Sequence, residues 1–174
     1  MTTHTDPTRA TTPDSPHETR FDLAEWAPKV YRAQIGFDAA ARTGLDPALV
    51  ELIQIRCSQL NGCAYCVHMH TTDARKAGES EERLHLVTVW REARNFFSEE
   101  EQTALALAEA VTKISEAGVP DALYRQGLEV FGPEGLSQVI AAICAINTWN
   151  RFAIATGKIP GTDERTRIRS GSKA

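Results

Sequence analysis

The chain has 174 residues, of which 42% are hydrophobic and 24% are charged, and its formal net charge is -4. A chain of this length buries enough surface to fold as one domain. The slightly acidic balance lacks the basic footprint that binding to DNA or RNA requires, so we expect no nucleic-acid partner.

The two ends of the chain differ in composition from its middle. Residues 1–20 are rich in Thr, Pro, Asp and Ser and contain no large aliphatic residue after Met1, which predicts a disordered N-terminal arm. Residues 158–174 hold more basic than acidic side chains, which predicts a flexible basic tail. Residues 21–157 are therefore expected to form the folded domain.

Hydrophobic residues within this domain recur at helical spacing, and no stretch alternates with period 2 for long enough to predict a strand. The predicted fold class is all-α, with about six to seven helices. Prolines, glycines and capping residues mark their ends, as at Pro47, at Gly78, and at Ser98 with Glu101. The expected helices cover residues 28–43, 47–60, 63–77, 79–94, 99–116, 120–131 and 134–156.

The sequence also bears on where the protein works. No apolar run approaches the roughly 20 residues that cross a bilayer, and no apolar segment follows a basic one at the N-terminus. We therefore expect no membrane association, no secretory signal and a cytoplasmic location. Thiols stay reduced in the cytoplasm, where a closely spaced cysteine pair is typically catalytic or metal-binding rather than a structural disulfide.

The four cysteines fall into two kinds. Cys63 and Cys66 are separated by two residues and follow a break in the helical pattern at Gly62. Both are therefore expected in the first turn of a central helix. Cys57 and Cys144 lie in apolar helical stretches and are expected to be small core residues.

His70 joins the cysteine pair on one side of that helix. Successive residues turn by about 100°, so Cys63, Cys66 and His70 lie within about 60° of one another, whereas His68 points the opposite way. The reactive form of cysteine is the thiolate, and a free thiol with a pKa of about 8.5 is only slightly ionised at neutral pH. A helix N-terminus and a histidine one turn beyond Cys66 both favour the thiolate. The pattern predicts a redox-active disulfide between Cys63 and Cys66.

A zinc site is the other chemical use of these side chains, because Cys63, Cys66, His68 and His70 are all of ligand type. Structural zinc usually takes two ligand pairs from separate segments, and the sequence offers no second pair. His68 also faces away from the other three. We therefore expect no metal and no cofactor.

Glu51 extends the pattern, because it lies twelve residues before Cys63. The order Glu51, Cys63, Cys66, His70 resembles the alkylhydroperoxidase D family, within the carboxymuconolactone decarboxylase superfamily of all-helical proteins. The resemblance is strong over residues 45–78. It is looser as far as residue 157, where the stretch Asn147-Thr148-Trp149-Asn150-Arg151 is also similar.

The resemblance implies a thiol-dependent peroxidase. Glu51 and His70 would form a proton relay with an ordered water that deprotonates Cys66, and Cys66 would attack the O–O bond of a hydroperoxide. Cys63 would then close the disulfide as the resolving thiol. A dithiol protein, either a lipoyl domain or a peroxiredoxin, would reopen it, and the subunits would form a homotrimer or a homohexamer.

Two features leave alternatives open. Cys63 is a second candidate for the nucleophile, because the N-terminal cysteine of such a pair is often the more acidic one. Tyr65 stands where the best-known peroxidases of the family place a histidine, and its pKa of about 10 prevents proton shuttling near neutral pH. A redox sensor or general thiol-disulfide oxidoreductase without efficient peroxidase turnover is therefore an alternative. A decarboxylase of the wider superfamily is disfavoured, since those enzymes generally lack the cysteine pair.

Overall fold

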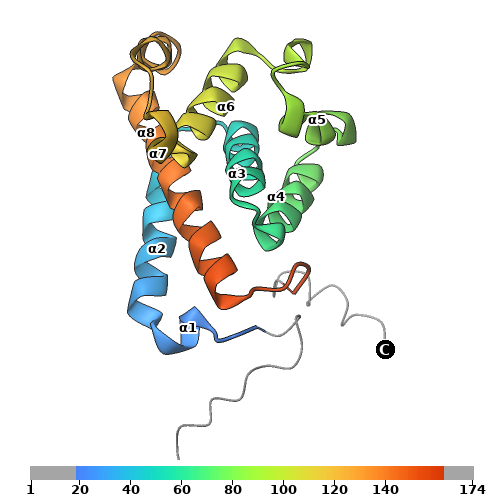
Figure 1. The fold of residues 1–174 in the computed structure, drawn as a ribbon, viewed down its shortest axis with the longest axis vertical. Coiled ribbons are helices and arrows are strands. Elements are labelled where there is room, and N and C mark those ends of the chain that lie inside the picture. Colours follow the sequence, from blue (N-terminus) through green and yellow to red (C-terminus); the bar gives the residue numbers. More distant parts are fainter. Residues whose placement is uncertain (1–18, 163–174) are drawn as a thin grey trace, which may run out of the picture.

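Every regular element in the part of the chain that the structure describes is a helix (Figure 1). The computed structural model describes residues 19–162, so most of the predicted arm (1–20) and tail (158–174) lies outside the described residues. The all-α prediction is confirmed. The elements are α1 (Leu23–Trp26), α2 (Pro28–Ala41), α3 (Pro47–Asn61), α4 (Ala64–Lys76), α5 (Glu81–Leu86), η1 (Val87–Val89), η2 (Arg94–Phe96), α6 (Glu99–Thr112), α7 (Ile114–Ala117) and α8 (Asp121–Thr156).

The number of helices differs slightly from the expected six to seven, because α1 and α7 are single turns of four residues. An element this short leaves no periodic pattern in the sequence. The helix expected over residues 99–116 divides at Lys113, whose φ of -103° and ψ of 34° are not helical. The break expected after residue 131 is confirmed: Gly132 has a φ of 67° and a ψ of 175°, and it separates the two halves of α8.

The single helix expected over residues 79–94 is wrong. The chain instead forms the six-residue α5, followed by two 3-10 turns, η1 and η2. The change falls at Val87, Thr88 and Val89, three consecutive β-branched residues whose side chains crowd an α-helix. Short 3-10 turns commonly take over at the ends of α-helices, as they do here.

The turn that joins α3 to α4 sets the position of the cysteine pair. Asp46 begins α3 by accepting hydrogen bonds from the backbone N–H groups of Ala48 and Leu49, at 2.8 and 3.1 Å. Gly62 ends it with a φ of 69°, in the left-handed region that favours glycine. The chain then reverses, and Cys63 becomes the N-cap of α4. The cysteine pair therefore lies at the N-terminus of a central helix, as expected.

α3 packs in the middle of the fold and has two apolar faces (Figure 1). One face contacts α6 and α8 in a cluster that contains Leu49, Ile53, Cys57, Leu107, Val139, Ile143 and Ile146. The other contacts α6 and the segment after α5 in a cluster that contains Leu52, Ile55, Val87, Trp90 and Leu105. These two clusters fix α3 in place, so side chains on its remaining face are held in defined positions.

The two cysteines outside the pair behave differently from each other. Cys57 lies in the core as expected, and burial raises the pKa of its thiol to about 12. Cys144 is exposed, so its assignment to the core is wrong. It lies on the side of α8 that faces away from the stripe formed by Val139, Ile143 and Ile146.

α8 is the one helix within residues 19–162 that is long and apolar enough to cross a membrane, judged by length and composition alone. Its packing is that of a core helix. Leu136, Val139 and Ile143 are buried against α3 and α6, and the non-helical backbone of Gly132 interrupts the run.

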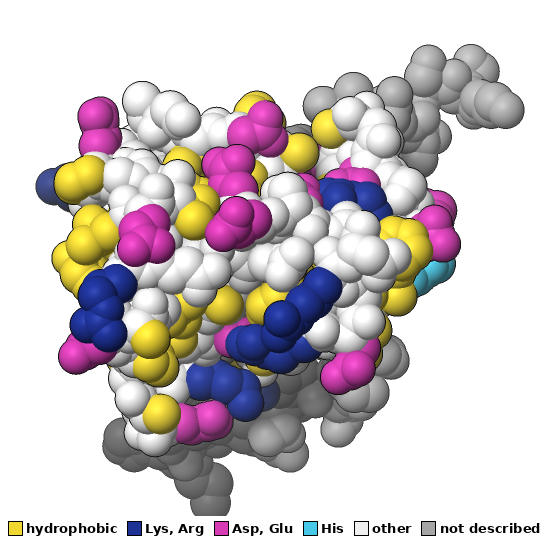
Figure 2. All heavy atoms as spheres, turned by 90° about the horizontal axis from the view of Figure 1, so that it is seen from above, with side chains coloured by type: hydrophobic (Ala, Val, Ile, Leu, Met, Phe, Trp, Pro, Cys, Tyr) yellow, Lys and Arg dark blue, Asp and Glu magenta, His cyan; other side chains and the backbone are white. Residues whose placement is uncertain are grey.

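The surface shows no dominant charge on the face drawn in Figure 2, where acidic and basic side chains are interspersed with hydrophobic ones. Elsewhere, large hydrophobic side chains are exposed on α1 and α2, at Trp26, Val30 and Phe37. Exposed apolar side chains that gather in one region are typical of protein contacts.

The two ends of the described chain meet beside α1. The backbone N–H of Arg20 donates to the carbonyl of Thr156 at 2.8 Å, and Lys158 forms an ion pair with Asp22 at 3.3 Å. The backbone N–H of Lys158 also donates to the carbonyl of Ala153 at 2.9 Å. Residues just outside the predicted 21–157 domain are thus attached to it.

Candidate active site

Both thiols of the cysteine pair are buried at the start of α4, with 1% of each residue exposed. The backbone N–H of Cys63 donates to the carbonyl of Ser58 at 2.9 Å, which ties the pair to the end of α3. The backbone N–H of Cys66 in turn donates to Cys63 Sγ at 3.4 Å. Ala153 of α8 packs against both cysteines. The pair is therefore held by three helices and screened from bulk water.

His70 and Glu51 form a pair between α4 and α3. His70 Nδ1 lies 2.9 Å from Glu51 Oε2, and only 4% of the histidine side chain is exposed. A carboxylate accepts the proton of Nδ1, so Nε2 of the neutral imidazole is the lone-pair nitrogen. Nε2 is buried and has no hydrogen-bond partner among the residues that the structure describes. The ring therefore presents a base whose orientation Glu51 fixes.

The two thiols differ in acidity. The hydrogen bond donated by the Cys66 thiol lowers the pKa of Cys63 to about 7, and backbone N–H groups at the helix N-terminus act in the same direction. The same hydrogen bond and burial raise the pKa of Cys66. Near neutral pH the pair therefore holds a single proton, which lies between the two sulfurs. Cys63 is the thiol that ionises first.

A cavity of about 300 Å³ is lined by one of the two cysteines. Cys66, His70 and Glu51 belong to its lining, and Cys63 does not. The rest of the wall comes from α1, α2, α4 and α8 and includes the apolar and aromatic residues Leu23, Tyr31, Ile35, Tyr65, Met69, Trp149 and Phe152. A small molecule with an apolar body entering the cavity would meet Cys66 and His70 together.

A chain of buried amides lies on the other side of the cysteines. Asn61 Nδ2 donates to Asn147 Oδ1 at 2.9 Å and to Asn150 Oδ1 at 2.8 Å. Asn150 Nδ2 donates to Ser58 Oγ at 3.0 Å. Hydrogen bonding by the Asn150 amide lowers the pKa of both thiols. The sequence pointed to residues 147–151 only through the family resemblance. It predicted no role in the chemistry for Ser58 or Asn61.

One sequence signal for these polar residues does exist on α3. Glu51, Gln54, Ser58 and Asn61 lie within about 80° of one another on the helix. Gln54 and Ser58 are fully buried, and an apolar core helix seldom places several polar side chains on one buried face. This stripe marks the side of α3 that faces the site.

The structure also places the side chains that the sequence offered as zinc ligands. Within residues 19–162, no group of three or more His, Cys, Asp or Glu side chains is placed to hold a metal ion. His68 is exposed and lies near Gly161 rather than beside the cysteines. The four residues that the structure does bring together are those of the predicted site: Glu51, Cys63, Cys66 and His70.

Comparison with known proteins places this chain in a family. The sequence profile of the carboxymuconolactone decarboxylase family matches residues 28–110. The uncharacterized protein YdfG of Bacillus subtilis (strain 168) is 48% identical over 107 residues, which are 62% of this chain and 72% of YdfG. The chain belongs to the carboxymuconolactone decarboxylase family. The uncharacterized protein YnjA of Escherichia coli (strain K12) is 30% identical over 118 residues, 68% of this chain and 64% of YnjA.

A solved structure shares the fold of this family member. It is the protein of unknown function ATU0492 from Agrobacterium tumefaciens, described as a candidate antioxidant defence protein AhpD. It matches with a TM-score of 0.79 and 35% identity over 84% of this chain and 100% of its own. The alkylhydroperoxidase D-like fold predicted from the residue pattern is confirmed.

Proposed function

We propose that the protein is a thiol-dependent peroxidase that reduces hydroperoxides through a cycle of the Cys63–Cys66 dithiol and disulfide. The observation that carries the proposal is the cavity whose lining includes both Cys66 and His70, together with the lack of a described hydrogen-bond partner for His70 Nε2. A peroxide reduction needs a thiolate and a group that moves protons at the same place. Both belong to the wall of one small cavity here.

The proposed cycle consists of attack on the peroxide, closure of the disulfide and reduction of the disulfide. Cys66 gives up its proton to His70 Nε2, and the thiolate attacks one peroxide oxygen, so that an S–O bond forms and the O–O bond breaks. The departing alkoxide takes the proton back from His70 and leaves as an alcohol, and Cys66 becomes a sulfenic acid. The Cys63 thiolate then attacks Cys66 Sγ, so that the S–S bond forms and the S–O bond breaks, and the departing hydroxide takes up the proton that Cys63 had released and leaves as water. An external dithiol returns two electrons and two protons.

Access through the cavity supports this division of roles, and the raised pKa of Cys66 means that its thiolate forms by proton transfer to His70. Cys66 is the sulfur that an incoming peroxide meets, since it is the one in the cavity wall. The backbone N–H groups at the start of α4 favour the thiolate of Cys63, which is the form that resolves the sulfenic acid. When the Cys63 thiolate attacks Cys66 Sγ, the hydroxyl group of the sulfenic acid is the leaving group.

The proposal is tested with an organic hydroperoxide and a recycling dithiol such as dihydrolipoamide. Turnover is expected in the wild type and absent in Cys66→Ser, whereas Cys63→Ser should accumulate a sulfenic acid that a diketone reagent labels once per chain. Cys144→Ser is the matched control and should retain full activity, because Cys144 lies outside the site. The proposal fails if the wild type forms no Cys63–Cys66 disulfide under mild peroxide.

A second candidate is a redox sensor or general thiol-disulfide oxidoreductase. It is favoured by the low pKa of Cys63, the property of an attacking thiol in disulfide exchange, and by Tyr65 in the cavity wall. In that case peroxide would oxidise the pair without sustained turnover, and a disulfide substrate would be reduced instead. For either function we propose a cytoplasmic location, a lipoyl domain or peroxiredoxin as reductant, and a homotrimer or homohexamer.

A further inference from the structure

A second cavity lies between α3 and the end of α4, and its volume is about 230 Å³. α3 contributes Ala48 and Glu51 to its lining, and the end of α4 contributes Ala74, Ala77 and Gly78. Ala48, Ala77 and Gly78 are exposed. A Cβ placed on Gly78 would meet no residue within 4 Å apart from its chain neighbours. The second cavity is therefore open to solvent on this side.

Glu51 belongs to both cavities. Within residues 19–162 it is the one residue that lines the active-site cavity and the second cavity alike. Its Oε2 lies 2.9 Å from His70 Nδ1, with 17% of the Glu51 side chain and 4% of the His70 side chain exposed. Glu51 therefore contacts the buried imidazole and also lines a cavity that opens to solvent.

The order of residues along α4 agrees with this arrangement. Cys66, His70, Ala74 and Gly78 follow one another at intervals of four, the spacing at which helix side chains lie one above the next. The first two line the active-site cavity, and the last two line the second cavity. Ala74 is small and buried, so α4 places only a methyl group between His70 and Gly78 on this side. The thiol, the base and the second cavity thus succeed one another along one side of the helix.

The proposed dithiol cycle has to move protons into and out of this buried site. One proton leaves the cysteine pair when Cys63 ionises, and one returns when the hydroxide departs from Cys66 and becomes water. Both cysteines are buried, and the alcohol product is formed in the active-site cavity before the hydroxide departs. A proton path that avoids the active-site cavity lets the disulfide close while that cavity is still occupied.

We propose that Glu51 exchanges the protons of the redox site with solvent through the second cavity. The inference rests on the dithiol cycle proposed above. When His70 Nε2 accepts a proton from the cysteine pair, the ring passes the proton of Nδ1 to Glu51 Oε2, and the protonated carboxyl releases it to water in the second cavity.

The return path reverses each transfer. Glu51 takes a proton from water, Nδ1 of His70 takes it from Glu51, and Nε2 gives its proton to the departing hydroxide. After one outward and one inward transfer, both side chains carry the protons with which they began.

The second cavity is suited to hold water, because its volume is several times the roughly 30 Å³ that one molecule occupies and its wall is partly polar. The other charged side chains of that wall, Glu79 and Arg83, form an ion pair with each other at 2.9 Å. This ion pair carries no proton in the proposed transfer. Glu51 is the carboxylate of the wall that also contacts the base.

The experiment fills the second cavity from its rim and leaves the active-site residues in place. Ala48→Leu and Ala77→Leu each enlarge an exposed side chain of the lining. Ala122→Leu is the matched control: Ala122 is exposed at the second position of α8, as Ala48 is at the second position of α3, and it lines neither cavity.

The first measurement is the rate at which the Nδ1 proton of His70 exchanges with water, followed by NMR in protein labelled with ¹⁵N-histidine. The signal is identified by its loss in His70→Gln, and thermal unfolding confirms that each variant folds. Ala48→Leu and Ala77→Leu should slow the exchange by about tenfold, the effect of losing one hydrogen bond between water and a charged group. Ala122→Leu should leave it unchanged.

The second measurement follows one turnover after a single dose of hydroperoxide. Ala48→Leu and Ala77→Leu should slow closure of the disulfide and not the preceding attack on the peroxide, which needs no proton from solvent. Three outcomes would overturn the proposal: unchanged exchange in both folded variants, equal slowing in Ala122→Leu, or closure at the wild-type rate where exchange is slowed. The exchange measurement uses no peroxide, so slowed exchange without peroxide turnover would reject the peroxidase and support the proton path.

Discussion

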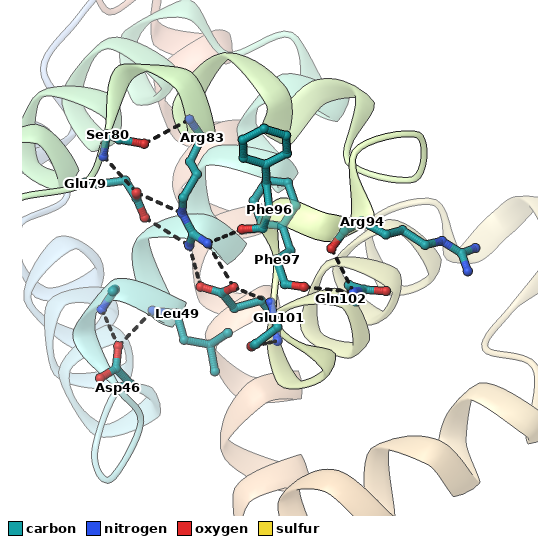
Figure 3. A network of polar contacts seen from close by, with 12 residues as sticks. Asp46, Leu49, Glu79, Ser80, Arg83, Arg94, Phe96, Phe97, Glu101 and Gln102 are labelled. Atoms are coloured by element: carbon teal, nitrogen blue, oxygen red, sulfur yellow. Dashed lines mark hydrogen bonds and ion pairs between the residues drawn. The ribbon is translucent and has the colours of Figure 1, made fainter.

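Two clusters of polar side chains use their hydrogen-bonding groups in opposite ways. In the Arg83 cluster, formed by Glu79, Arg83 and Glu101 between α5 and α6, the guanidinium lies between two carboxylates (Figure 3). In the active-site cluster, formed by Glu51, Cys63, Cys66 and His70, a ring nitrogen is left without a described partner and two thiols share a proton. The polar groups of the Arg83 cluster are paired with one another, whereas the active-site cluster keeps a nitrogen and a thiol that can take part in a reaction.

The completeness of the Arg83 cluster can be followed bond by bond. Arg83 Nε lies 2.9 Å from one carboxylate oxygen of Glu79, and Nη2 lies 2.5 Å from one of Glu101. Arg83 also donates to the carbonyl of Phe96 and lies over the ring of Phe97. Glu101 accepts the backbone N–H of Ser98 in a capping box. Paired groups of this kind join α5 to α6, and every nitrogen of the Arg83 guanidinium already donates a hydrogen bond.

The largest effect is expected from removing the unpartnered base of the active-site cluster. His70→Gln should lower kcat/KM for hydroperoxide by about a hundredfold or more, because a positioned general base contributes at least that factor. Steady-state turnover at pH 7 measures the loss. His68→Gln is the matched control, since His68 is exposed on the same helix. If the two variants lose activity equally, His70 is not the base.

The shared proton of the cysteine pair predicts a distinct pH dependence. The thiolate is the deprotonated form, so the alkylation rate of Cys63 should rise with pH, reach half its plateau near pH 7 and flatten above about pH 8. Partial desolvation of the otherwise exposed Cys144 thiol raises its pKa, so its alkylation rate should still be increasing at pH 9. Mass mapping of both cysteines in one pH series checks this. Parallel curves for the two would contradict the assignment of Cys63 as the acidic thiol.

Breaking the Arg83 cluster should affect stability and not chemistry. Arg83→Met leaves Glu79 and Glu101 facing each other at half-buried positions and should lower the free energy of unfolding by about 1–2 kcal/mol. Urea unfolding measures this loss, and the folded variant should retain the wild-type kcat. Arg75→Met, which removes the exposed ion pair with Glu81, is the control and should change stability little. A large loss of kcat in Arg83→Met would contradict this prediction and would show that the Arg83 cluster contributes to catalysis.

The smallest effect concerns Gln54, whose fully buried amide has no hydrogen-bond partner for either polar atom among the described residues. Gln54→Met keeps the shape of the side chain and removes the desolvated amide, so it should raise the free energy of unfolding by about 1 kcal/mol. Gln34→Met is the matched control and should lower it, because Gln34 Nε2 donates to the carbonyl of Ala145 at 3.0 Å. Urea unfolding of both variants decides; a loss of stability in Gln54→Met would assign that amide a partner in solution.

The sequence could predict the features that depend on residues lying close together along the chain. Gly62, the cap at Asp46 and the one-turn spacing of Cys66 and His70 are local features, and the structure has them as expected. Local patterning did not supply Glu51, which came from a resemblance. The segment after α5 was misjudged because a run of β-branched residues outweighed the helical pattern there.

Features that depend on distant parts of the chain could not be predicted from local sequence patterns. Asn150 and Ser58 are 92 residues apart in the sequence, and only the packing of α8 on α3 brings their side chains together. The cavity likewise needs α2 and α8 side by side, which no local spacing encodes. Periodicity reports which face of a helix is buried, and it does not report which other helix covers that face.

The meeting of the chain ends has a practical consequence for anyone who trims this protein. A fragment cut to residues 21–157, the limits suggested by composition, would keep all four predicted site residues. It would nevertheless lose Arg20, which holds the end of α8, and Lys158, which anchors Asp22 and forms part of the cavity wall. Leu23, also in that wall, would then belong to a fraying terminus. The smallest unit with an intact active-site entrance is therefore longer than the smallest unit that contains the active-site residues.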